Sequence, residues 1–354
     1  MREPTYCAFC PKLCTHACPV SRATRRETHT PWGKQTTLWE ARRGLIRMSA
    51  GYVEPRFACA GCHACTDACD HAIDVASSLD GGRALAFDEG LLPGPISRLH
   101  RDQPARERAA RDGIASLGGA HSPGQAARTV LFPGCSAAIG DPALVASAAS
   151  VFREMAGDSA AIYGDRCCGL PYLQAGDVAG FVEAARKLAA DLRGVGTIVA
   201  LAPGCALALR KRYPAAGVDV EAEVLTLPEF VLPHMRRLAR RTSLEAPVFY
   251  HDPCQLGRGL GVYEEPREIL LRLVAGGARD LHLARASGPC CGGGGAIPAT
   301  MPDAASSIVG RLVGLLRDQG AATVVTACPT CLQMISAAGG IAAVDITTLM
   351  ARAL

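Results

Sequence analysis

The chain reads Tyr250-His251-Asp252-Pro253-Cys254, then Cys290-Cys291-Gly292-Gly293-Gly294-Gly295, then Cys328-Pro329-Thr330-Cys331. An earlier region repeats this order as Pro133-Gly134-Cys135, Cys167-Cys168-Gly169 and Cys205. In both copies 36 residues separate the vicinal cysteine pair from the next cysteine. Thiolates that converge from three turns can hold a metal cluster. The second copy therefore predicts a cluster site on Cys254, Cys290, Cys291, Cys328 and Cys331.

The first copy has only four cysteines, because Ala208 stands where the second copy has Cys331. Four thiolates suffice for a [4Fe–4S] cubane or for a tetrahedral zinc ion. A vestigial, empty site is the third alternative. The occupant of the set Cys135, Cys167, Cys168 and Cys205 stays open at this point.

The whole chain has 354 residues and 17 cysteines. Its N-terminus is polar and cysteine-bearing rather than an apolar secretory signal, so we expect a cytoplasmic protein with reduced thiols. No apolar run reaches the roughly 18 residues of a transmembrane helix. A net charge of +4 is too small to indicate nucleic-acid binding. Arginine clusters such as Arg22, Arg25 and Arg26 are either solvated helix faces or a surface for an acidic partner or the inner face of a membrane.

Residues 1–80 carry two further groups of four cysteines. The second group has the spacing of bacterial two-cluster ferredoxins, in which the fourth cysteine ligates the other cluster. Crossed ligation predicts one [4Fe–4S] cluster on Cys7, Cys10, Cys14 and Cys69, and another on Cys59, Cys62, Cys65 and Cys18. Zinc sites are the alternative. The extra residue between Cys10 and Cys14, and Asp70 in place of a proline, depart from the ferredoxin pattern.

The rest of the N-terminal region favours helices. Forty residues separate Cys18 from Cys59, too many for a compact βαββαβ ferredoxin. Thr30-Pro31 predicts a helix start, and the stretch from Lys34 to Met48 places Leu38, Ala41, Leu45 and Met48 on one helical face. We therefore predict an α-helical ferredoxin-like domain at residues 1–80. Residues 81–127 are rich in Gly, Pro, Arg and Asp, which predicts a linker with one short helix around 104–116.

An α/β pattern begins at residue 129. Short apolar strands at 129–132, 197–201, 248–250 and 324–326 each end in a cysteine turn, and helices are expected at 142–155, 178–192 and 308–316. Cysteines at strand ends place the sites at the carboxyl edge of mostly parallel sheets, where open α/β folds bind ligands. We predict an α/β fold with two tandem repeats, 128–243 and 244–354, in a pseudo-twofold pair with both sites near their interface.

The residues beside the second cysteine set suggest further roles. Gly292 to Gly295 lack the Lys and Ser/Thr of a phosphate-binding loop, so we expect Gly292 and Gly293 to approach the cluster with their backbone N–H groups. His251 and Asp252 either relay protons or contact a quinone or thiol, or they support the turn as a cap and a hydrogen-bond donor. No GxGxxG after a strand and no flavin fingerprint is present, so any flavin belongs to a partner.

These motifs resemble the cysteine-rich CCG domain of heterodisulfide reductase subunits and of the iron–sulfur subunits of glycolate oxidase, anaerobic glycerol-3-phosphate dehydrogenase and lactate-oxidising complexes. The resemblance spans about residues 129–354, and Gln255 stands where the dehydrogenase group often has His. It implies a [4Fe–4S] cluster, noncubane in heterodisulfide reductases, on the five cysteines of the second copy. There such clusters carry out the disulfide chemistry, so the five cysteines and His251 are candidate catalytic residues.

Three functions are compatible with these features. The first is an electron-transfer subunit between a flavoprotein (an FAD-linked dehydrogenase or oxidase) and a quinone, a membrane subunit or another acceptor. The second is a catalytic subunit that reduces a disulfide at the five-cysteine cluster. The third is a sensor of iron or redox state. The row of predicted cluster ligands favours conduction over sensing.

Overall fold

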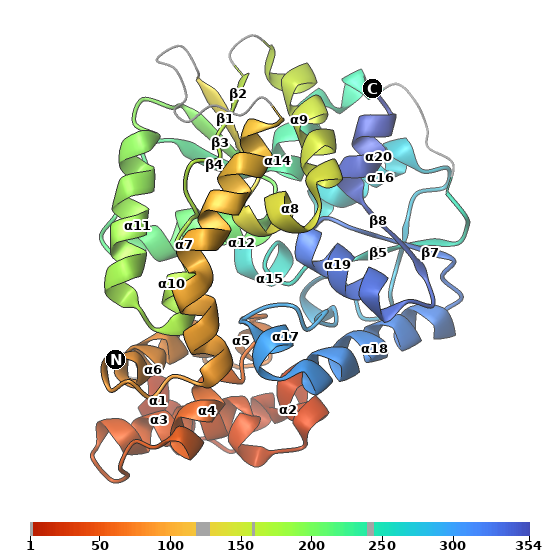
Figure 1. The fold of residues 1–354 in the computed structure, drawn as a ribbon. Coiled ribbons are helices and arrows are strands. Elements are labelled where there is room, and N and C mark those ends of the chain that lie inside the picture. Colours follow the sequence, from red (N-terminus) through yellow and green to blue (C-terminus); the bar gives the residue numbers. More distant parts are fainter. Residues whose placement is uncertain (1–2, 118–127, 158–159, 239–243) are drawn as a thin grey trace.

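The computed structural model describes residues 3–117, 128–157, 160–238 and 244–354. Its N-terminal part is entirely helical and forms the base of the molecule (Figure 1). Its elements are α1 (Glu3–Ala8), η1 (Leu13–Ala17), α2 (Pro19–Thr24), η2 (Glu27–His29), α3 (Pro31–Arg42), α4 (Ala50–Phe57), α5 (Ala64–Asp67) and α6 (Val75–Asp88). The predicted α-helical character of this region is confirmed.

Helix α3 begins as predicted but ends early. The Thr30 side chain accepts a hydrogen bond from the Gly33 N–H, and Pro31 occupies the first turn. The helix stops at Arg42, and Gly44 follows in the left-handed region with φ 70°. Leu38 is fully buried, but Leu45 is 63% exposed. The predicted continuation of one apolar face to Met48 is therefore wrong, because the chain turns at Gly44.

The predicted linker is largely helical. Helix α6 runs past residue 80, and α7 (Gly94–Ala115) extends for 22 residues instead of a short turn around 104–116. A stripe at helical spacing buries Ile96, Gln103, Ala110 and Ile114. Helix α7 rises from the N-terminal part and packs against α8, α10 and α17 (Figure 1). Residues 118–127 of that segment, and the predicted boundary at 243, lie outside the described residues.

The first repeat is a parallel four-stranded sheet in the order β2-β1-β3-β4. Its strands are β1 (Thr129–Phe132), β2 (Ala160–Ile162), β3 (Thr197–Ala200) and β4 (Glu223–Thr226). Its helices are α8 (Cys135–Gly140), α9 (Pro142–Ala156), α10 (Leu170–Ala175), α11 (Val178–Asp191), α12 (Pro203–Leu207), the π-helix η4 (Ala208–Arg212), α13 (Tyr213–Ala215), α14 (Leu227–Val231) and η5 (Leu232–Arg237).

The second repeat has the equivalent order β6-β5-β7-β8, again parallel. Its strands are β5 (Val248–His251), β6 (Arg279–Asp280), β7 (Thr323–Thr326) and β8 (Ala342–Asp345). Its helices are α15 (Gly257–Leu260), α16 (Glu264–Leu273), η6 (Arg285–Ser287), α17 (Ile297–Thr300), α18 (Pro302–Asp318), α19 (Pro329–Ala338) and α20 (Ile346–Arg352). The α/β class with two tandem repeats is confirmed.

The two repeats pack reciprocally. Helix α9 of the first contacts α20, the last helix of the second, and α16 of the second contacts α14, the corresponding last helix of the first. One continuous apolar core contains residues of all four helices, among them Phe152, Val231, Leu270 and Leu349. Exchange of equivalent contacts is the signature of an approximate twofold axis, and it places the carboxyl edges of both sheets toward each other.

Candidate metal centres

The cysteines of both repeats face one cavity. Each first and last cysteine follows the end of a β-strand, so the parallel arrangement of the strands carries these thiols to the same edge of each sheet. A cavity of about 330 Å³ lies between the repeats. Eight of the nine repeat cysteines line it: Cys135, Cys167, Cys168, Cys205, Cys254, Cys291, Cys328 and Cys331. Helix α7 supplies a further wall, with Ile96, Leu99, Gln103 and Arg106.

The five thiols of the second repeat form one contact group. Four of them are buried and Cys254 is half-buried. The Cys331 and Cys291 sulfurs are 3.2 Å apart. Hydrogen bonds from Cys290 and then Cys331 lower the pKa of Cys291 well below its ordinary value, and the neighbouring His251 acts in the same direction against the effect of burial. These neighbours thus favour the thiolate form of Cys291.

The four thiols of the first repeat are grouped in the same way. The Cys135 and Cys167 sulfurs are 3.4 Å apart. The hydrogen bond to Cys167 and burial raise the pKa of Cys135. Ala208, at the position equivalent to Cys331, is fully buried. The Tyr213 hydroxyl closes this side by donating to the Cys168 carbonyl at 3.0 Å.

A search of protein families matches the cysteine-rich domain CCG twice, at residues 129–210 and 248–336. The chain carries two cysteine-rich CCG domains. It is 28% identical to a subunit of the fumarate reductase (CoM/CoB) of Methanothermobacter marburgensis over 323 residues, which cover 90% of this chain and 65% of that protein. It is 26% identical to a subunit of the dihydromethanophenazine:CoB–CoM heterodisulfide reductase of Methanosarcina acetivorans, with 84% and 77% covered.

Two further likenesses complete the comparison. The "EtfAB:quinone oxidoreductase" of Syntrophomonas wolfei is 32% identical over 152 residues, which cover 40% of this chain and 21% of that protein. A solved structure of a hypothetical protein from Helicobacter pylori has a TM-score of 0.56 at 9% identity and covers 92% of this chain and 67% of that chain. That likeness concerns the fold alone. Within the described residues, no helix has the length and apolar character needed to span a bilayer.

The glycine turn of the second CCG domain has two functions. The Gly292 N–H donates to the Cys290 sulfur at 3.3 Å, and a Cβ on Gly293 would lie 3.6 Å from the Cys291 sulfur. Gly294 and Gly295 lie against the N-terminal domain: a Cβ on Gly295 would lie 1.8 Å from the Cys59 carbonyl oxygen. These last two glycines let the backbone of the N-terminal domain approach the CCG domain. The sequence alone did not indicate that contact.

The eight N-terminal cysteines are named by the two ligand sets that their spacing predicts. We call Cys7, Cys10, Cys14 and Cys69 set A, and Cys18, Cys59, Cys62 and Cys65 set B. Burial and then the nearby charges of Cys69 and Cys10 raise the pKa of Cys14 to about 11. The three set A cysteines Cys7, Cys10 and Cys14 line one small cavity of about 150 Å³ together with Cys69 and Cys65. Because Cys65 of set B lines this cavity as well, crossed ligation stays a prediction.

A buried cation lies against set B. Lys34 is 1% exposed, and its Nζ donates to the Cys18 sulfur at 3.5 Å. Burial opposes its charge, but the thiolates of Cys18, Cys59 and Cys65 outweigh that effect and raise the pKa of Lys34. Burial would raise the pKa of Cys18, but the charge of Lys34 prevails and lowers it. Lys34 appeared in the sequence only as the first residue of a helical stretch, so its role was missed.

The N-terminal domain and the second CCG domain meet at their thiols. Cys62 of set B and Cys290 share a hydrogen bond, which together with burial raises the pKa of Cys62. Arg258 spans this junction: its Nε donates to the Cys62 carbonyl and its Nη1 to the Gly288 carbonyl, both at 2.7 Å. Burial opposes the charge of Arg258, whereas Cys62, Cys254 and Cys290 raise its pKa. Arg258 was missed because its neighbours are distant in the sequence.

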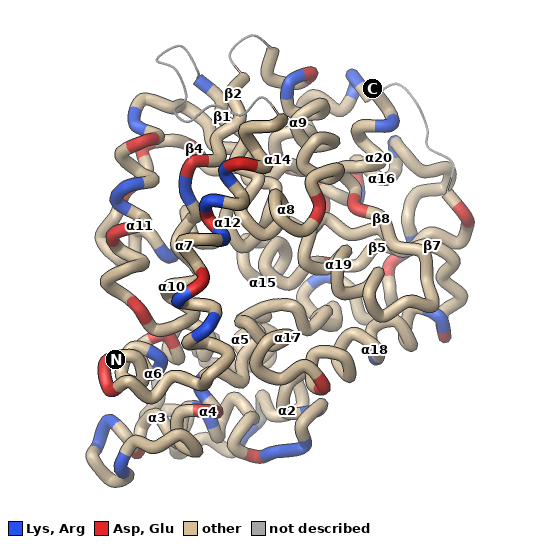
Figure 2. The backbone as a smooth tube through the Cα atoms, viewed as in Figure 1, with Lys and Arg blue, Asp and Glu red and all other residues tan. Residues whose placement is uncertain are grey.

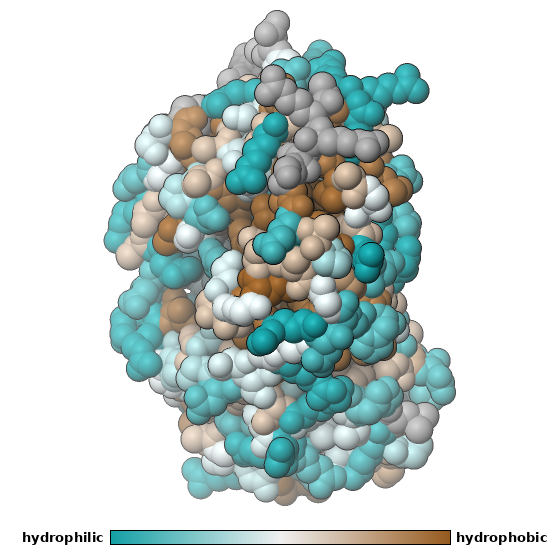
Figure 3. All heavy atoms as spheres, turned by 90° about the vertical axis from the view of Figure 1, so that its right-hand side faces the viewer, coloured by the Kyte–Doolittle hydropathy of each residue, from teal (hydrophilic) through white to brown (hydrophobic). Residues whose placement is uncertain are grey.

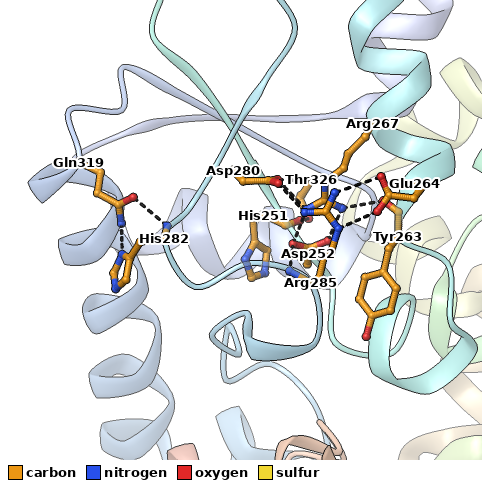
Figure 4. Close-up of polar contacts among 10 residues, drawn as sticks. All are labelled: His251, Asp252, Tyr263, Glu264, Arg267, Asp280, His282, Arg285, Gln319 and Thr326. Atoms are coloured by element: carbon orange, nitrogen blue, oxygen red, sulfur yellow. Dashed lines mark hydrogen bonds and ion pairs between the residues drawn. The ribbon is translucent and has the colours of Figure 1, made fainter.

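Figure 4 shows that His251 and Asp252, just upstream of Cys254, have different surroundings. Asp252 is held by Arg267 through two hydrogen bonds of 2.8 Å and accepts a third from the Arg285 N–H at 2.7 Å. These contacts make Asp252 a support of the turn. His251 is 1% exposed, and neither ring nitrogen has a hydrogen-bond partner among the described atoms. Its ring lies beside Cys291 and affects that thiol.

The residues present fit iron–sulfur clusters. All seventeen cysteines are free thiols, and thiolate is the ligand that such clusters use. The Arg258 Nη2 is buried without a hydrogen-bond partner at the junction of two thiol groups, so the site can accommodate a further acceptor. No three or more His, Cys, Asp or Glu of the described chain are arranged for a single metal ion.

Proposed function

We propose that this chain is the iron–sulfur electron-transfer subunit of a multi-subunit oxidoreductase. Sets A and B would each hold a [4Fe–4S] cluster, the five thiols of the second CCG domain a third, and the four thiols of the first a fourth. These groups supply one-electron redox chemistry when bound. The chain's own residues ligate them, space them, exclude water and set the surrounding charge.

The observation that carries this proposal is the unbroken series of thiol groups. Cys14 of set A lies within the electrostatic reach of Cys18 of set B. Set B meets the second CCG domain at the Cys62–Cys290 contact, and the second domain faces the first across the shared cavity. An isolated ferredoxin domain would not need such a junction. The relatives named as reductase subunits and as a quinone oxidoreductase support the same function.

The proposed partners are suggested by the relatives and by the absence of a flavin motif from the sequence. We propose a flavoprotein on one side and a quinone or another acceptor on the other, because the sequence contains no flavin fingerprint of its own. We place the complex in the cytoplasm, with a peripheral position at the inner face of the membrane where the acceptor is a quinone. The chain spans 65% of the length of the fumarate reductase relative it matches, so the activity of that whole protein is not transferred.

The test is iron, acid-labile sulfide and zinc per chain, measured on protein purified without oxygen. We expect about 16 iron atoms with matching sulfide, that is, four four-iron clusters. About 12 iron atoms with one zinc would make the first CCG domain structural. About 8 would leave both CCG domains without clusters and contradict the proposal.

A second function is favoured by the shared cavity. Thiols from both CCG domains line the same 330 Å³ space, which is within the size range of small-molecule sites. We infer that a disulfide could be reduced there at the five-cysteine group, as the heterodisulfide reductase relatives suggest. Disulfide reduction by the dithionite-reduced chain alone, abolished by Cys331→Ala, would support this function. Co-purification with a flavin-containing partner and no such activity would support electron transfer only.

A further inference from the structure

A second cavity reaches the junction from the opposite side. It measures about 610 Å³ and lies between α2 of the N-terminal domain and α18 and the segment 282–290 of the second CCG domain. Cys290, which is absent from the lining of the shared cavity, lies on its wall. Pro19 and Ala64, which are adjacent to set B cysteines in the sequence, line the same space. Residues next to set B and Cys290 of the five-cysteine group therefore share the wall of one cavity.

The cavity is strongly basic. Arg22, Arg25, Arg258 and Arg311 line it, whereas Asp67 is the one carboxylate among its lining residues. Figure 2 shows basic residues along α2. In Figure 3, the lower part of the face that carries the second CCG domain is mostly hydrophilic. The cavity also has an apolar part, which includes Leu283, Ile308 and Leu312.

The arginines at its rim have no partners. Arg22, Arg25 and Arg311 are exposed, and their guanidinium groups make no hydrogen bond or ion pair within the part of the chain that the structure describes. Neighbouring arginines that point elsewhere are neutralised: Arg26 pairs with Glu54 at 2.9 Å, and Arg285 pairs with Glu264 at 2.7 Å. Unpaired positive charge is thus concentrated around the mouth of this cavity.

We propose that this basic cavity is the docking site of an acidic electron-carrier protein. The inference rests on the proposed electron-transfer function and adds a second port to it, at the junction rather than at set A. The small cavity beside set A has Lys12 and Asp70 on its wall and no such excess of charge. Complementary charge steers association and fixes orientation, and the apolar part of the cavity provides the close contact that an interface core needs. One electron leaves the reduced carrier and enters this chain, and no bond forms or breaks.

The test uses the cluster-loaded chain and a plant-type [2Fe–2S] ferredoxin, a small acidic carrier, as the probe. The variant Arg22→Glu with Arg311→Glu reverses two rim charges. Its matched control, Arg186→Glu with Arg193→Glu, makes the same change of net charge at and just after α11, on the far side of the molecule (Figure 1). All four arginines are exposed. Iron content and thermal unfolding are measured first, as the check that each variant is intact.

We expect the rim variant to weaken binding of oxidised ferredoxin about tenfold to a hundredfold at low salt, and to slow reduction by reduced ferredoxin by a similar factor. The control should change either quantity less than twofold, and high salt should remove the difference. Equal affinities for parent, rim variant and control would overturn the docking site. If dithionite reduces the clusters of all three proteins in that case, the electron-transfer function stands; if the parent binds no cluster or none is reduced, that function fails first.

Discussion

The two CCG domains share a fold but differ around their thiols. Their sheets have the same strand order, and each carries its cysteines at the same strand ends. The residue three positions before the first cysteine is His251 in the second domain and Phe132 in the first, both about 1% exposed. Cys331 corresponds to Ala208, and the turn Gly292–Gly295 corresponds to Gly169-Leu170-Pro171-Tyr172. These three differences lie at positions where the second domain contacts its own thiols or the N-terminal domain.

This comparison separates what the fold needs from what the site needs. The first domain is complete as a folded unit without a fifth thiol, a buried histidine or a four-glycine turn. Where α19 (Pro329–Ala338) is a regular helix, the first domain has a π-helix that begins at Ala208. The first domain thus folds without these features, and in the second domain Gly294 and Gly295 lie against the backbone of the N-terminal domain.

We expect the largest effect from removal of the fifth thiol. Cys331→Ala gives the second domain the four-thiol set of the first. Since four thiols are proposed to hold a cluster in the first domain, we expect this variant to keep its iron but to lose the electron paramagnetic resonance signal that is specific to the five-thiol site. Ala208→Cys is the complementary control and should leave the iron content unchanged. If Cys331→Ala kept its iron and its spectrum, four thiols would suffice in both domains and the two sites would be equivalent.

The glycine turn gives the next largest effect. Gly295→Ala places a Cβ 1.8 Å from the Cys59 carbonyl oxygen, at a residue with φ 62°. Because a backbone atom cannot move aside as a flexible side chain can, we expect the N-terminal domain to be displaced and the stability to fall by about 4 kcal/mol, measured by denaturant unfolding. Gly310→Ala in α18 meets nothing within 4 Å and should be neutral or stabilise by up to about 1 kcal/mol. Equal effects of the two changes would mean that the close approach at Gly295 is not required.

The sequence predicted those parts of the fold and site that depend on local pattern. The cysteine spacing, the strands before the cysteine turns and the start of α3 at Thr30-Pro31 are set by residues near one another. The crossed ligand sets inferred from the ferredoxin spacing stay a prediction. The domain boundaries also stay a prediction.

What the sequence did not reveal depends on contacts between distant segments. Helix α7 contains Pro95 and Pro104, and its surface is rich in arginine. Because few of its residues are buried, its sequence resembles that of a linker. Nothing in the sequence showed that the backbone of Cys59 and Ala60 lies against Gly294 and Gly295. The role of Arg258 likewise follows only from the junction of two domains.

The caps of the final helices supply a pH-dependent comparison. Asp345 caps α20 by accepting from the Thr347 N–H at 2.8 Å, whereas Thr226 is the cap of the corresponding helix α14. Burial raises the pKa of Asp345 from 3.8 to about 6. Because the pKa is higher in the folded than in the unfolded chain, the protonated carboxyl contributes its full stabilisation below pH 4. This contribution is lost as the pH rises through 6.

The free energy of unfolding of the parent should fall by up to about 3 kcal/mol between pH 4 and pH 7, and Asp345→Asn should remove this fall. The measurement is the free energy of unfolding across that range. Asp318→Asn, on the exposed end of α18, is the control and should follow the parent. Parallel curves for Asp345→Asn and the parent would show that the Asp345 carboxyl titrates at the same pH in the folded and unfolded chain.

The histidine difference gives the smallest and most specific prediction. His251→Phe introduces the counterpart residue, Phe132, while it keeps a buried ring. His251 stabilises the thiolate of Cys291, and groups that stabilise negative charge on sulfur favour the reduced state of a cluster. We expect about a tenfold shift of the reduction equilibrium toward the oxidised state, which is about 59 mV for one electron, in a redox titration followed by paramagnetic resonance. His282→Phe, an exposed residue whose ring faces Gln319 at 2.6 Å (Figure 4), should not move the potential. An unchanged potential in His251→Phe would mean that His251 only fills space, as Phe132 does, and that the two CCG domains differ in thiol number alone.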